Sequence, residues 1–195
     1  MKGNKKKITI SIIVMLCVAV LVIGGYFFIT NNAMNFGSGS NKSSSELEKL
    51  KEKDLETQYP DSPDEVVKFY WRLNKCMYNE KMDDADFEAL LKQVRLLYDE
   101  EFLNEEENSY KTMLSNFKSE RDSYQKKKNK IVHYAINPTK KTEYSEKDKK
   151  EYAIVHSYVT TKQKSETTNT NEKFLCKKDD SGNWKIVGWE LDSDK

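Results

Sequence analysis

The sequence is poor in the residues from which most enzyme and nucleic-acid sites are built. It has two histidines, and only Arg72, Arg95 and Arg121 among its 33 basic residues are arginines. Two histidines are too few for a multi-histidine metal centre, and three guanidinium groups leave little for bidentate recognition of phosphates or bases. Beyond residue 40 the only glycines are Gly182 and Gly188, so no glycine-rich phosphate loop or dinucleotide motif can be built. No Cys-x-x-Cys or His-Glu-x-x-His occurs, which argues against a zinc site and leaves no cofactor or metal predicted.

Charge is also missing from one long stretch, because no charged residue lies between Lys7 and Lys42. Within this gap, 18 of the 23 residues at 8–30 are hydrophobic and the others are Thr, Ser and Gly. A helix of this length would be roughly 34 Å long, enough to cross a bilayer core of about 30 Å. Residues 8–30 are therefore predicted to form a transmembrane helix in contact with the lipid bilayer.

The alternative for this segment is a cleaved signal peptide. The apolar run is longer than such a peptide needs, and no good small-x-small cleavage site follows it. Cys17 lies in the middle of the run, whereas a lipoprotein signal needs a cysteine just after it. We therefore expect an uncleaved, single-pass signal anchor in the cell membrane. The lysines in residues 1–7 favour a cytoplasmic N-terminus and an extracytoplasmic C-terminal domain.

The net charge of +1 conceals an uneven distribution. Residues 42–195 carry 29 basic and 32 acidic side chains, so 61 of 154 residues are charged, well above the roughly 25% of ordinary domains. This slightly acidic balance predicts no binding to nucleic acid. Residues 31–59 are expected to form a flexible Asn/Gly/Ser linker followed by a charged helical stalk. Its three leucines favour a solvated helix over a coiled-coil partner site.

Helical patterns open the extracytoplasmic domain, which is expected to cover residues 60–195. Ser62 and Pro63 fit the cap and first position of a helix, and Glu65 fits the third position of a capping box. Apolar residues then recur at helical spacing. Two further helices are predicted at 86–98 and at 104–128, the latter acidic at its start and basic at its end, as the helix dipole favours.

The pattern changes to strands after residue 130. Four strands are predicted at 131–137, 152–161, 172–178 and 183–191, and the second is apolar on both faces, as expected of a central strand. A charged loop is expected between the first two strands, and residues 179–183 suit a tight turn between the last two. Helices followed by antiparallel strands predict an α+β fold with three helices packed on a sheet of about four strands.

Two segments resemble the nuclear-transport-factor-2-like superfamily. Residues 62–70, SPDEVVKFY, look like its opening helix, and residues 182–189, GNWKIVGW, look like its closing hairpin. The resemblance covers about residues 60–192 and implies a cone in which helices wrap a curved antiparallel sheet around a pocket. The long third helix and the insertion near 138–150 depart from the simplest pattern. Small single-pass bacterial proteins with this kind of ectodomain exist, many of them uncharacterised, and 30 lysines against three arginines fit an AT-rich bacterial genome.

Few side chains qualify as site residues. His156, with Tyr158 and Tyr134, could line a pocket as an acid or base, but no carboxylate partner is placed by spacing, which favours a structural histidine. Cys76 and Cys176 would both be extracytoplasmic, where a disulfide is permitted, although two separate buried thiols are the alternative we favour.

These observations favour a membrane-anchored extracytoplasmic binding or interaction domain without enzymatic activity, whose ligand is unknown. Its partner would be an envelope protein or a second copy of the chain. One alternative is an assembly subunit of a conjugation or secretion machine. Another is a small-molecule isomerase or dehydratase that uses the pocket of the cone, since members of one fold include enzymes and binding modules alike.

Overall fold

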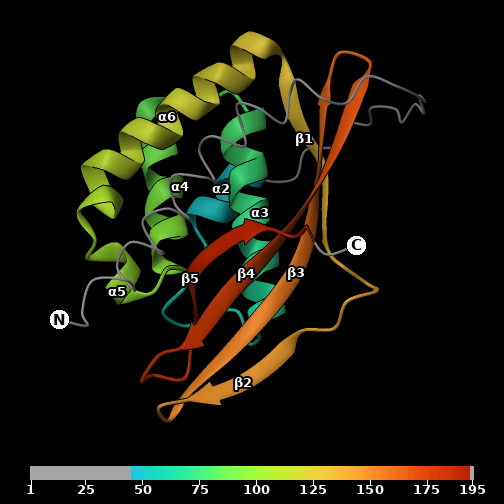
Figure 1. Cartoon of the computed structure of the whole chain (residues 1–195). Coiled ribbons are helices and arrows are strands. Elements are labelled where there is room, and N and C mark those ends of the chain that lie inside the picture. Colours follow the sequence, from blue (N-terminus) through green and yellow to red (C-terminus); the bar gives the residue numbers. More distant parts are fainter. Residues whose placement is uncertain (1–44, 194–195) are drawn as a thin grey trace, which may run out of the picture.

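The structure, a computed structural model, describes residues 45–193. The predictions of a cytoplasmic tail at 1–7, a transmembrane helix at 8–30 and a linker up to residue 44 lie outside the described residues. Among residues 45–193 no helix is long and apolar enough to span a membrane. The described chain is an α+β fold in which helices pack on an antiparallel sheet of five strands (Figure 1), which confirms the predicted fold class.

The first predicted helix is confirmed as α3, Pro63–Asn79. The hydroxyl of Ser62 accepts a hydrogen bond from the backbone N–H of Glu65 at 3.2 Å and caps the helix as expected. The carboxylate of Glu65 pairs with Lys68 at 2.6 Å, an (i, i+3) contact on the same helix. The apolar stripe of α3 faces the core, where Val66, Leu73 and Met77 are among its fully buried residues.

The other two predicted helices differ in their limits. The second is α4, Asp84–Leu96, which starts two residues early because Asp83 caps it. The third prediction is wrong in its first part, since the chain forms a short helix and a 3-10 turn before the long helix begins. Ser109 caps that long helix by accepting a hydrogen bond from the N–H of Thr112. The three pieces are α5, Glu100–Leu103, η1, Glu106–Asn108, and α6, Tyr110–Lys127.

The sheet has one more strand than predicted. Its strands are β1, Asn129–Ile136, β2, Glu143–Lys147, β3, Lys150–Gln163, β4, Glu166–Lys178, and β5, Trp184–Leu191. The order is β1-β3-β4-β5, and β2 also pairs with β3. β1 and β2 pair with different parts of the same edge of β3, so the two strands lie one after the other along it. The predicted charged loop at 138–150 is corrected accordingly, because it contains β2.

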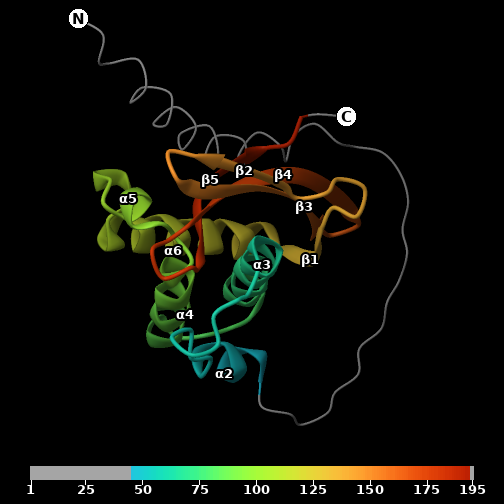
Figure 2. The same cartoon turned by 90° about the horizontal axis from the view of Figure 1, so that it is seen from below.

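All described helices lie on one side of the sheet (Figure 2). The core between the two layers is rich in aromatic side chains from α3, β4 and β5. The expected solvated stalk also contributes to this core. Residues Glu46–Lys51 form α2, Leu50 is fully buried and Leu55 is 6% exposed. These leucines attach the segment to the domain, which corrects the expectation of a free helix before residue 60.

Candidate functional site

The predicted site residues lie on both faces of the sheet. Tyr134 lies opposite the buried Val159 and shares the helix-facing side, where the ammonium of Lys75 is 6.0 Å from its ring centroid. His156 and Tyr158 alternate with Ser157 and Val159 along β3, so they point to the opposite face. The structure therefore does not bring Tyr134, His156 and Tyr158 together in one pocket.

His156 has the carboxylate partner that its sequence context did not reveal. Its Nδ1 lies 2.7 Å from Oδ2 of Asp192, the residue after β5, and its Nε2 lies 3.5 Å from Oε1 of Glu143 on β2. The Nζ of Lys140 donates to both carboxylate oxygens of Asp192 at 3.1 and 2.9 Å. The side chain of His156 is buried, and the residue is 6% exposed. The cluster thus ties two segments, the one that enters β2 and the one that follows β5, to the open face of β3.

The electrostatics of Asp192 fit a structural role. Burial alone would raise the pKa of Asp192, but the hydrogen bonds from Lys140 and His156 outweigh burial and hold it below its usual value. Both ring nitrogens of His156 face carboxylates, and the hydrogen bonds of the described residues place no hydroxyl or thiol against them. A histidine that activates a nucleophile needs one nitrogen directed at that nucleophile. The observed contacts of His156 therefore hold neighbouring strands together.

Tyr158 bonds to the other histidine. Its hydroxyl lies 3.1 Å from Nε2 of His133 across the β1–β3 pair, and this contact is exposed to solvent.

The two cysteines of the described domain are not bonded to each other. Cys76 on α3 and Cys176 on β4 are both buried and free. Burial raises the pKa of each thiol to about 12. The structure therefore has two separate thiols and not the disulfide.

A second polar cluster, missed in the sequence, lies inside the core. Glu172 on β4 faces the helices and is 7% exposed, and its Oε2 has no hydrogen-bond partner. Glu120 on α6 accepts a hydrogen bond of 2.6 Å from the hydroxyl of Tyr78. Tyr124 of α6 stacks on Tyr78 with ring centroids 4.9 Å apart. Glu172 occupies an inward position of its strand, two residues before Phe174, and that alternation is the signal that could have identified it.

Burial sets the protonation of this acidic pair. Burial, and to a smaller extent the nearby Glu120 carboxylate, together raise the pKa of Glu172 to about 8. The pKa of Glu120 is also raised by burial, although the hydrogen bond from Tyr78 opposes this. Glu172 is therefore a neutral carboxylic acid at pH 7. A neutral acid near a second carboxyl group is an arrangement that acid–base enzymes use when substrate can reach it.

Aromatic rings fill the helix-facing side of the sheet near this pair. The ring of Tyr70 lies 5.4 Å from that of Phe174 and 5.8 Å from that of Trp189, measured between centroids. Trp71 packs edge-on against Tyr70 at 5.4 Å and donates a hydrogen bond of 3.1 Å from its indole nitrogen to the hydroxyl of Ser157. The interior of the described domain is thus a packed aromatic core.

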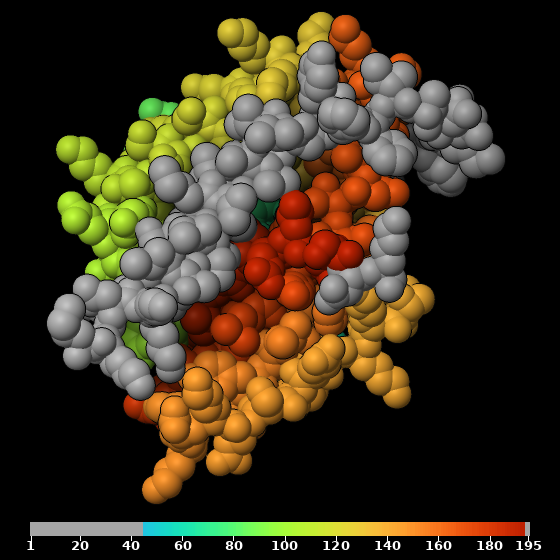
Figure 3. Space-filling model, viewed as in Figure 1, coloured from blue at the N-terminus to red at the C-terminus, as the bar shows by residue number. Residues whose placement is uncertain are grey.

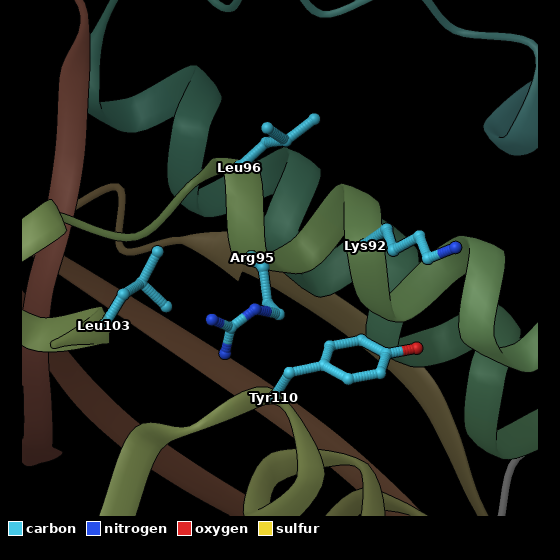
Figure 4. A pocket seen from close by; sticks show the side chains of 5 residues that line it. All are labelled: Lys92, Arg95, Leu96, Leu103 and Tyr110. Carbon is cyan, nitrogen blue, oxygen red and sulfur yellow. The ribbon is translucent and has the colours of Figure 1, made fainter. Parts of the chain in front are cut away.

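Two hollows stand out on the described part of the chain, and neither is lined by Glu120, Glu172 or His156. The larger, of about 440 Å³, lies between α4 and the segments from α5 to α6 (Figure 4). Its lining residues are Lys92, Arg95, Leu96, Leu103 and Tyr110. The smaller, of about 260 Å³, is lined by Lys128, Lys130, Val132, Lys162 and Lys164. Residues 45–193 contain no group of three His, Cys, Asp or Glu side chains able to hold a metal ion.

No curated protein matches the chain in a sequence search. A family model matches residues 1–189, which include both the apolar segment and nearly all of the folded domain. The chain therefore belongs to the family described as a domain of unknown function, DUF6715.

Proposed function

We propose that the chain is a non-enzymatic binding domain held at a membrane by residues 8–30, with residues 45–193 on the extracytoplasmic side. The length and apolar composition of residues 8–30 and the lysines in residues 1–7 support this placement. The family match, which runs from residue 1 to residue 189, supports treating the segment and the domain as parts of one architecture.

The side chains best suited to acid–base chemistry are buried, and this observation is the main support for a non-enzymatic function. His156 is buried between two carboxylates, and Glu172 is buried beside a packed aromatic cluster. A general acid or base must come within hydrogen-bond reach of its substrate, directly or through one water molecule. Surface contact with a partner requires no such access, so the arrangement favours binding.

The fold we propose is of the nuclear-transport-factor-2-like type. All described helices precede the strands in the chain, and all lie on one side of the antiparallel sheet. β1 and β2 share one edge of β3, which gives that strand partners along most of its length.

The buried acid pair supports a second candidate, an acid–base enzyme of the isomerase or dehydratase type. Glu172 would be its neutral acid and Glu120 its carboxylate. In that case the aromatic core would have to open enough for a small molecule to reach Glu172. A cellular phenotype that is lost in Glu172→Gln but kept in a variant of an exposed glutamate would favour this candidate.

Photo-crosslinking tests the binding proposal on the full chain in its membrane. A photoreactive amino acid is placed, one position at a time, at exposed apolar positions on different surfaces: Leu96, Val132, Tyr144 and Leu175. A binding domain gives one defined adduct at one surface and little at the others. Adducts with the mass of two copies would favour the assembly-subunit alternative. A chain that remains monomeric and gives no adduct at any position would contradict the proposal.

A further inference from the structure

A cluster of lysines forms one end of the domain. It comprises Lys126, Lys127, Lys128, Lys130, Lys162 and Lys164, which we name the lysine face, and all six are exposed. They come from the end of α6, the start of β1 and the β3–β4 hairpin, which lie side by side at the top of Figure 1 and of the space-filling view in Figure 3.

Four of these lysines surround the smaller hollow, whose remaining lining residue is Val132. Lys130 and Lys162 lie directly opposite each other on the antiparallel strands β1 and β3. Like charges in that position repel each other and destabilise the pair. Within residues 45–193 none of the six lysines forms an ion pair with a carboxylate. A ligand that carries negative charge would relieve this repulsion.

The charge is local, because the domain as a whole is acidic. Residues 45–193 carry 27 basic and 31 acidic side chains, a net of −4, yet no Asp or Glu occurs between Asp122 and Glu143. The β2–β3 hairpin at the other end of the sheet is different. There Lys147 and Lys149 alternate with acidic residues, so its charge is mixed. The lysine face is therefore a positive end on a negative domain.

We propose that the lysine face docks the domain onto the anionic phospholipid headgroups of the bilayer that holds residues 8–30, an inference that rests on the proposed membrane anchor. The six ammonium groups extend beyond one hollow and come from two separate segments, residues 126–130 and 162–164, which suits an array of separate headgroup phosphates. Lysine binds phosphate as a point charge and needs no fixed geometry. The Asn/Gly/Ser composition of residues 31–44 predicts a linker with a root-mean-square span of roughly 20 Å, which would keep the domain near that surface.

Energy transfer in nanodiscs tests the docking with the full chain. A donor fluorophore is attached through Ser165→Cys in the β3–β4 turn, with Cys17→Ser to remove the cysteine of the apolar segment, and the acceptor is on the headgroups. We expect higher energy transfer in discs with about 30% anionic lipid than in neutral discs, and this transfer should decrease with added salt. A donor attached through Ser181→Cys at the opposite end of the sheet should show no such increase.

Matched variants distinguish the effect of the lysine face from the effect of the net charge of the domain. Lys130→Gln with Lys162→Gln should weaken docking by about fivefold for each lysine, whereas Lys147→Gln with Lys149→Gln, which removes the same charge, should leave it unchanged. Equal thermal melting of the two double variants shows that both are folded.

Different results would overturn the docking, the lipid assignment and the membrane anchor. Equal transfer in neutral and anionic discs, or an equal loss in both double variants, overturns the docking. Release of the domain by stoichiometric soluble tripolyphosphate, beyond a salt control of the same ionic strength, would assign the lysines to a soluble phosphate ligand instead and overturn the lipid assignment. Failure of the chain to insert into any disc contradicts the membrane anchor itself.

Discussion

Replacement of Glu172 by Gln tests whether the core holds a neutral acid. The pKa of Glu172 is about 8 in the folded chain, against an ordinary value of 4.5. Between these values the folded state binds a proton that the unfolded state has lost, so the free energy of unfolding falls by about 1.36 kcal/mol per pH unit. The contribution of Glu172 to stability is complete below pH 4.5 and is lost as the pH rises to about 8. At pH 7, about 2.5 units above the ordinary value, the loss is about 3 kcal/mol.

The Glu172→Gln variant has a neutral side chain of similar size and no such proton to hold. We expect equal stability of the two proteins near pH 4 and a variant more stable by about 3 kcal/mol at pH 7. Glu166→Gln, at an exposed position of the same strand, is the matched control and should follow the natural chain. Unfolding of the full chain in micelles by urea is measured by tryptophan fluorescence, because all three tryptophans lie in the described domain.

Two results would contradict a protonated Glu172 in the folded core. Stability curves that run parallel from pH 4 to pH 8 would show that Glu172 does not keep its proton in the folded chain. A Glu172→Gln variant that is less stable at pH 7 would show that the carboxylate makes a favourable contact in the folded state.

Three further predictions concern other parts of the domain. Leu50→Ala should lower the free energy of unfolding by about 3 kcal/mol, whereas the same change at the partly buried Leu47 should cost much less; equal small effects would contradict the burial of α2. Asp192→Asn should lower the free energy of unfolding, measured with urea, by about 2 kcal/mol at pH 7. The variant should also lack the loss of stability that the natural chain shows as the pH falls through the carboxyl range. An unchanged decrease of stability at low pH would contradict the pairing with His156. Thiol titration without reductant should find three reactive cysteines in the unfolded chain and neither Cys76 nor Cys176 reactive in the folded one; a single reactive thiol after unfolding would mean a disulfide.

The sequence predicted those elements whose pattern reflects burial. α3 combines a cap at Ser62 with an apolar stripe, and its start was predicted to the residue. β3 and β5 carry apolar side chains on the face that packs against the helices, and this burial gives each strand a recognisable pattern. By contrast, every residue of β2 is exposed, so no periodicity distinguishes it from a loop. The break before α6 depends on the cap at Ser109, a local signal inside a stretch with helical composition.

The polar clusters were less accessible to sequence reasoning because their members are distant in the chain. His156 and Asp192 are separated by 36 residues and meet only because the chain after β5 crosses the open face of the sheet. Glu172 and Glu120 come from a strand and a helix on facing layers. The lysine face likewise joins two lysine-rich segments whose proximity depends on the pairing of β1 with β3.

The placement of the domain outside a membrane underlies both proposals, and cysteine accessibility on intact cells tests it most directly. Ser181→Cys is exposed in the turn between β4 and β5, and Asn4→Cys marks the N-terminal tail, while the native Cys76 and Cys176 are buried. Each variant of the full chain is treated with a maleimide that does not cross membranes. We expect labelling of Ser181→Cys on intact cells and of Asn4→Cys only after permeabilisation. The reverse pattern, or recovery of the chain in the soluble fraction, would contradict it.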